Sequence, residues 1–325
     1  MNQKLSSSFK LKYLNLLLVG IALAYLTYKF NDYHQQNYGQ LFIDILTNGN
    51  TSLLFVALIL IPFNYGIEAK KWQILLSPLQ HVSWINAFKS ILAGITISIF
   101  TPNRTGEVIG KVVYLDLQEK MKAALLNFSG SMAQMICTSL AGLWGTIIYL
   151  NFYSFKEIDL PATQVIYAIA SICTLLAFLI YFNQQKFFTW ISNKKWAKKI
   201  HISFTNQQQF KSSLQVKVLV LSIIRYIVFS SQLVLLLNFC GIHAAIFQLF
   251  LLCTVFFLVM WFLPSFALTE LGVRGSVAVM LFQNVSENIS GALLAVVLLW
   301  IINVALPALI GCIYVFNLTG KKDFE

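Results

Sequence analysis

The sequence predicts an all-α polytopic membrane protein with six full transmembrane helices and two re-entrant helical hairpins, arranged as an inverted-topology repeat. Of the 325 residues, 58% are hydrophobic and 11% are charged, and the mean hydropathy is +0.72. Soluble domains carry about 25% charged residues. The apolar residues form continuous runs of roughly 20, the length that an α-helix needs to cross ~30 Å of hydrocarbon. A barrel would instead show alternating strands of about 10 residues.

Six apolar runs are expected to span the membrane. Their approximate bounds are Leu11–Phe30, Thr51–Gly66, Ala123–Phe152, Thr163–Phe182, Val216–Phe239 and Gly291–Phe316. The first run has no small-residue cleavage site, so we expect it to be a span and not a signal peptide. We expect one integral membrane domain over residues 1–325, with repeats at about 11–152 and 163–316 and no soluble domain.

Two further apolar arms, Ile85–Phe100 and Ile246–Leu263, are each followed by a proline-containing break and a shorter arm, which ends near Leu115 or Gln283. The charges of the loops determine how these arms enter the membrane. Lysines without acids occupy the N-terminal segment and the connector between the fourth and fifth spans, at positions 4, 10, 12, 186, 194, 195, 198, 199 and 211. The positive-inside rule therefore places both termini in the cytoplasm. When the spans are counted from the cytoplasmic N-terminus, each long arm and the shorter arm after it must enter and leave on the same side of the membrane. The first pair enters from the cytoplasm and the second from outside.

The net charge of +11 does not require a nucleic-acid partner, because the basic residues lie in short loops beside the spans. The five cysteines lie in or beside apolar runs without metal-ligand spacing, and the four histidines are scattered over connecting segments. We therefore expect no metal, no cofactor and no nucleic-acid partner. We also expect a multi-pass protein of the inner or plasma membrane.

The two predicted hairpin tips share a pattern. Each has Phe-x-Pro, an acid five or six residues after the proline, and a base four residues after the acid: Glu107 and Lys111 in the first, Glu270 and Arg274 in the second. An acid that precedes a base by four residues favours an ion pair on one helix face. The residues expected to shape the tips are Pro102, Thr105, Gly106, Pro264, Thr269 and Gly272. Proline ends the incoming helix, and either threonine can cap the outgoing one.

The charged tip residues are the candidate substrate-binding groups: Arg104, Glu107, Lys111, Glu270 and Arg274. Ionisable groups inside a membrane are costly and usually face the bundle interior or a water-filled cavity. A helix N-terminus beside basic side chains also favours an anion. The alternative remains that each charged pair only holds its hairpin together.

At these tips the sequence resembles the lysylphosphatidylglycerol synthase transmembrane region family, a flippase-like membrane domain. The family motif Pro-Gly-Arg-x-Gly-Glu reads here as Pro-Asn-Arg-Thr-Gly-Glu over residues 102–107. A later motif, Leu-Gly-Val-Arg-Glu, matches residues 271–275 except for its last position, where Gly275 replaces the acid and Glu270 is the nearest substitute. The resemblance implies a domain that moves lipid-linked substrates between leaflets.

We therefore expect a flippase or transporter for a lipid or polyprenyl-phosphate-linked substrate, with membrane lipids as partners. One alternative is an intramembrane enzyme that acts on a lipid-linked substrate. No nucleophile or metal constellation supports that reading, so we expect no catalytic residues. The other alternative is a non-transporting membrane component of a cell-envelope assembly.

Overall fold

The computed structural model describes residues 43–45, 47, 49–101, 104–112, 115, 120–151, 160–192, 211–263 and 267–319. Within these ranges every regular element is a helix. The elements are α3 (Thr51–Leu76), α4 (Trp84–Ile99), α5 (Gly106–Val112), α6 (Lys120–Tyr149), α7 (Leu160–Phe182), α8 (Gln184–Ser192), α10 (Ser212–Phe239), α11 (Ile246–Phe262), α12 (Ala267–Phe282), α13 (Ile289–Trp300), the π-helix η4 (Ile301–Ala305) and α14 (Leu306–Thr319). The predicted first span, Leu11–Phe30, lies outside the described residues.

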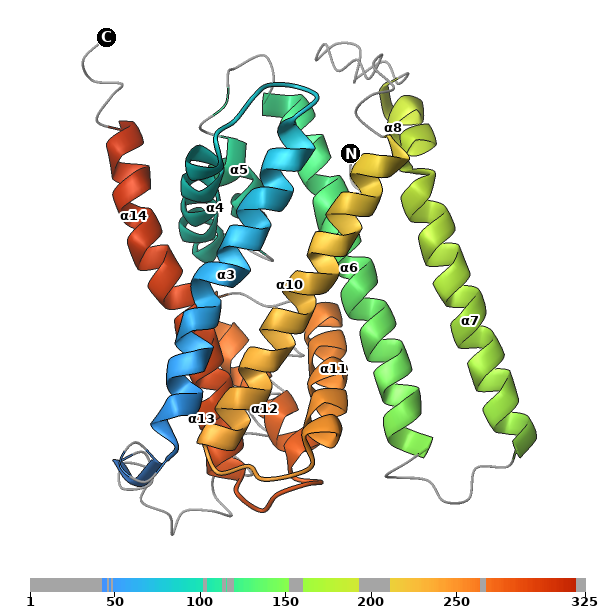
Figure 1. The fold of residues 1–325 in the computed structure, drawn as a ribbon, viewed down its shortest axis with the longest axis vertical. Coiled ribbons are helices and arrows are strands. Elements are labelled where there is room, and N and C mark those ends of the chain that lie inside the picture. Colours follow the sequence, from blue (N-terminus) through green and yellow to red (C-terminus); the bar gives the residue numbers. More distant parts are fainter. Residues whose placement is uncertain are drawn as a thin grey trace, which may run out of the picture.

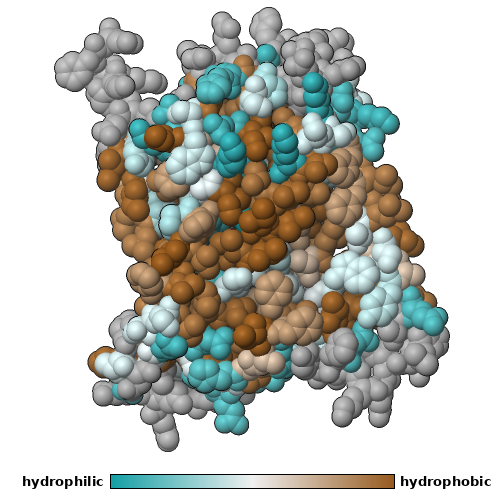
Figure 2. Space-filling view, in the orientation of Figure 1, coloured by the Kyte–Doolittle hydropathy of each residue, from teal (hydrophilic) through white to brown (hydrophobic). Residues whose placement is uncertain are grey.

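Five helical stretches in the described ranges are long and apolar enough to cross a membrane. They are Thr51–Leu76, Lys120–Tyr149, Gln164–Phe182, Ser212–Phe239 and Ile289–Val315. Figure 2 shows an apolar band across the middle of the face in view, with polar residues towards its two ends. Isoleucines and leucines of α7, such as Ile169 and Leu175, are also exposed. Because water would disfavour so continuous an apolar surface, we conclude that the chain is a multi-pass membrane protein.

The bounds of one predicted span are wrong. The sequence predicted an end at Gly66, ahead of a charged cytoplasmic segment, but α3 continues to Leu76. Two charged residues of this extension, Glu68 and Lys71, do not need bulk water, because they are buried and form an ion pair 2.6 Å long. These two charged residues therefore belong to the packed bundle and not to a cytoplasmic loop.

Two pairs of shorter helices lie at opposite ends of the bundle. Figure 1 shows α4 and α5 in the upper half and α11 and α12 in the lower half. Helix α4 packs against α3, α5 and α14, whereas α11 packs against α6, α10 and α12. The α4–α5 contact is tight, because a Cβ added to Gly110 would collide with the backbone of Gly94. The second arm of this pair ends at Val112, before the predicted end near Leu115.

The last apolar stretch is interrupted at mid-length. Figure 1 shows α13 in the lower half and α14 in the upper half, and the π-helix η4 joins them. Pro307 lacks an N–H, so it cannot donate to the carbonyl of Asn303 four residues earlier. That carbonyl instead accepts a hydrogen bond from the hydroxyl of Tyr65 on α3. π-helical segments are frequent at functional sites, and this one places polar groups in the interior of the bundle.

Candidate functional site

All three arginines of the chain line one small cavity in the interior of the bundle. Arg104, Arg225 and Arg274 come from the α4–α5 turn, from α10 and from α12. The cavity has a volume of about 90 Å³, and its walls also include Glu68 and Glu107. Arg104 and Arg274, from the two predicted tips, thus share one polar cavity.

Glu68 on α3 is the centre of the first group of ion pairs. Its carboxylate lies 2.6 Å from Nζ of Lys71, 3.0 Å from Nζ of Lys111 and 3.2 Å from Nη1 of Arg225. The Glu68 side chain is only 7% exposed. One carboxylate thus connects α3 with α5 and α10, and it balances charges that would be costly to bury alone.

Lys111 contacts two carboxylates. Its ammonium lies 2.6 Å from Glu107, four residues earlier on α5, and 3.0 Å from Glu68. It also donates to Oδ1 of Asn127 on α6 at 3.1 Å. The predicted Glu107–Lys111 pair is therefore confirmed, while the bonds to α3 and α6 were not predicted.

Glu270 forms the second group, in which it contacts both tip arginines. Arg274 donates to Oε1 of Glu270 through Nε at 2.9 Å and through Nη2 at 2.6 Å, which confirms the predicted pair on α12. Arg104 donates through Nη2 to both carboxylate oxygens, at 2.8 and 3.0 Å. This bond joins the α4–α5 turn to α12, so the two predicted tips are in direct contact.

The backbone at the first tip has an unusual conformation. Arg104 has a φ of 55°, in the left-handed region that residues with side chains seldom adopt. Such a conformation costs on the order of 1–3 kcal/mol and persists only where the surroundings enforce it. The bond between Arg104 and Glu270 is one contact that fixes this turn.

Some of the other predicted tip residues lie outside the described part of the chain, and the rest lie at the start of α5 or within α12. Pro102 and Pro264 lie outside the described residues, as does the side chain of Thr269. Thr105 immediately precedes α5, and Thr101 accepts the hydrogen bond from the N–H of Gly106 at 2.7 Å. Gly106 is buried and Gly272 lies within α12.

Polar side chains connect the charges to the π-helix. Nε of Arg225 donates to Oδ1 of Asn64 at 3.0 Å, and Nδ2 of Asn64 donates to Oδ1 of Asn303 at 3.0 Å. Neither these residues nor Glu68 and Lys71 were predicted as site residues from the sequence. A signal was available for Arg225, because an arginine in the middle of an apolar run costs about 2.5–3.5 kcal/mol unless it has partners.

The two groups together carry excess positive charge. Five cations and three carboxylates form these ion pairs: Lys71, Lys111, Arg104, Arg225 and Arg274 with Glu68, Glu107 and Glu270. The difference is two positive charges, so the arrangement favours an added anion. In the described part of the chain, no group of three or more His, Cys, Asp or Glu residues is placed to hold a metal ion.

Comparison with known proteins assigns the family. A search of curated proteins gave no match to this chain. The family model described as Lysylphosphatidylglycerol synthase TM region matches residues 14–311, which include every residue of the ion-pair groups. The chain therefore belongs to the lysylphosphatidylglycerol synthase transmembrane region family.

Proposed function

We propose that this protein moves a lipid or polyprenyl-phosphate-linked substrate across the cytoplasmic membrane. The family and the membrane-helical fold both support a role in lipid handling. The observation that carries the more specific proposal is the excess of two positive charges in the two ion-pair groups. Arginines of these groups, including Arg104 and Arg274 from the two tips, line one cavity. A lipid phosphate is the anion most readily available to such a site inside a membrane.

The contacts of Glu270 suggest how a phosphate binds. Its carboxylate lies between the guanidinium groups of Arg104 and Arg274, with bonds of 2.6–3.0 Å. Guanidinium groups bind carboxylate and phosphate with the same forked geometry. A substrate phosphate therefore competes with Glu270 for the two arginines, and its binding separates the two tips.

We take the structure to represent a closed conformation. Ligand pockets usually measure about 300–1,000 Å³, whereas this cavity measures about 90 Å³. A headgroup enters only when the Arg104–Glu270 bond opens. In our mechanism Arg104 and Lys111 bind the phosphate at the first tip, and Arg274 binds it at the second. Glu107 and Glu270 position these bases or carry a coupling proton.

We further propose the complete topology on which this mechanism depends. It has six spans, both termini in the cytoplasm, and α4–α5 and α11–α12 as hairpins that enter from opposite faces in an inverted repeat. Their positions in opposite halves of the bundle support this arrangement (Figure 1). Inverted-repeat transporters place their sites near the bilayer midplane, at the interface of the repeats. We assign no catalytic residue, and membrane lipids are the proposed partners.

The experiment is a headgroup-exposure assay on the full-length protein in vesicles made from a native lipid extract. Arg104→Ala and Arg274→Ala should each abolish transbilayer movement, and Arg104→Lys should retain part of it because the charge remains. Lys186→Ala, which removes an exposed cation on α8, is the control and should transport normally. Unimpaired transport by both alanine variants would exclude these arginines from the substrate path.

A further inference from the structure

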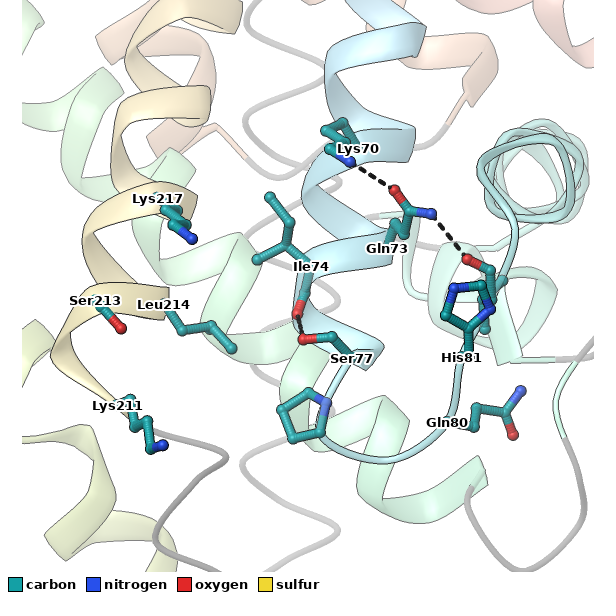
Figure 3. A pocket seen from close by; sticks show the side chains of 12 residues that line it. Lys70, Gln73, Ile74, Ser77, Gln80, His81, Lys211, Ser213, Leu214 and Lys217 are labelled. Carbon is teal, nitrogen blue, oxygen red and sulfur yellow. Dashed lines mark hydrogen bonds between the residues drawn. The ribbon is translucent and has the colours of Figure 1, made fainter.

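A second and larger cavity lies at one end of the bundle. It measures about 710 Å³ and is formed by the end of α3, by the segment that follows it and by the start of α10. Figure 3 shows its cationic side chains: Lys70 on α3 and Lys211 and Lys217 on the opposite wall. It shares no lining residue with the arginine-lined cavity.

The lining of this cavity includes basic and neutral residues but no acid. In the described ranges, none of its three lysines lies within ion-pair distance of a carboxylate, and all three are exposed. This distinguishes them from Lys71 and Lys111, which are buried beside glutamates. Their charges are therefore available to an anion from outside the protein.

One lysine is held in place by a neutral amide. Nζ of Lys70 donates to Oε1 of Gln73 at 2.9 Å, and Nε2 of Gln73 donates to the carbonyl of Val82 at 2.9 Å (Figure 3). The bond to Val82 fixes the orientation of the amide, and the amide in turn positions the ammonium. Because the amide is uncharged, this bond places no negative charge beside the ammonium.

The start of α10 adds to the positive potential. Lys211 occupies the N-cap position of this 28-residue helix and makes no side-chain capping bond. The N-terminus of a helix carries a partial positive charge that favours anions. Lys211, Ser213 and Leu214 from this end line the cavity.

The remaining lining is suited to a ligand with polar and apolar parts. Ile74, Pro78, Val82 and Leu214 form apolar walls, and Oε1 of Gln80 is buried without a hydrogen-bond partner in the described structure. The volume lies within the usual range for ligand pockets. Both α3 and α10 are long and apolar enough to span the membrane, so we place the cavity where a spanning segment meets the membrane surface.

We infer that this cavity binds a phosphate ester, carried either by an anionic phospholipid headgroup or by a soluble molecule. The inference goes beyond the proposed transport function, since binding here requires no movement across the bilayer. The site also differs in chemistry from the arginine-lined cavity, because its lysines have no carboxylate within ion-pair distance in the described part of the chain.

The test measures binding of a fluorescent short-chain phosphatidylglycerol to the full-length protein in detergent. The variant Lys211→Gln/Lys217→Gln removes two charges from the cavity. The matched control, Lys120→Gln/Lys186→Gln, removes two charges from α6 and α8, outside the cavity. Two lysines contribute about 1 kcal/mol each to binding an anionic surface, which corresponds to about 30-fold in affinity.

We expect the cavity variant to bind about 10- to 30-fold more weakly than the native protein and the control variant to bind normally. Competition with glycerol phosphate then identifies the source of the ligand. Displacement indicates a soluble phosphate ester, and its failure indicates a lipid headgroup. Equal binding by the native protein and the cavity variant, or equal losses in both variants, would overturn the inference. Because Arg104 and Arg274 are unchanged in both variants, a failure here is distinct from a failure of the transport assay.

Discussion

Replacing Glu270 by glutamine tests the contact between the two tips. The substitution keeps the shape of the side chain but removes the charge that Arg104 and Arg274 share. In the native structure this carboxylate is 7% exposed and accepts four hydrogen bonds from the two guanidinium groups. In the variant, two cations face each other without a carboxylate between them.

The size of the effect follows from the burial of each partner. Removing one member of a buried ion pair destabilises a protein by about 3–5 kcal/mol. The Arg274 side chain is 12% exposed, so the loss of its ion pair with Glu270 should destabilise the protein by nearly the full amount for a buried pair. The Arg104 side chain is 39% exposed and keeps much of its hydration, so the loss of its ion pair with Glu270 should add little to the destabilisation. We therefore expect a loss near the lower end of this range, about 3 kcal/mol.

The assay compares thermal unfolding of the native protein and Glu270→Gln, with and without a short-chain anionic phospholipid. The variant should unfold at a lower temperature, and the lipid should stabilise it more than the native protein because the arginines no longer have a competing carboxylate. A ligand at about 100 times its Kd adds ~2.7 kcal/mol, which nearly offsets the expected loss. Equal stabilisation of both proteins by the lipid would refute the competition between Glu270 and phosphate.

Three further predictions concern the bundle and its topology. Glu68→Gln should destabilise the protein by about 3–5 kcal/mol in thermal unfolding, since three cations lose their shared carboxylate; an unchanged melting temperature would contradict the ion pairs. Gly110→Ala should cost about 1–3 kcal/mol through overpacking, whereas Gly66→Ala should be neutral or stabilising, because its Cβ would lie 3.5 Å from the nearest ring atom. Equal effects of the two substitutions would be evidence against the tight α4–α5 contact. Single cysteines at Lys186 and Glu287 should react with impermeant reagents from the cytoplasm and from outside, respectively; labelling from the same side would rule out the proposed topology.

The sequence predicted those features that depend on neighbouring residues. Apolar runs indicated the spanning helices, and the spacing of four residues predicted the Glu107–Lys111 and Glu270–Arg274 pairs, because helix geometry alone brings such residues together. It did not predict the bond between Arg104 and Glu270, which are 166 positions apart. Which side chain reaches a distant carboxylate depends on how the helices pack.

The main error came from treating charge as a sign of solvation. The sequence predicted that a span ends before Lys70 and Lys71, but Lys71 is buried beside Glu68, and α3 continues past both lysines. Hydropathy records the chemical type of a residue and not its partners. The π-helix was likewise missed, although Pro307 removes a hydrogen bond at a position that the sequence shows.

The most direct measurement is a high-resolution density map of the full-length protein in nanodiscs made from the native lipid extract. The proposed mechanism predicts a class of particles in which the phosphate of a lipid contacts Arg104 and Arg274 and Glu270 has moved away. The contradicting result is an intact Arg104–Glu270 bond and an empty cavity in every class, obtained from a preparation that transports lipid.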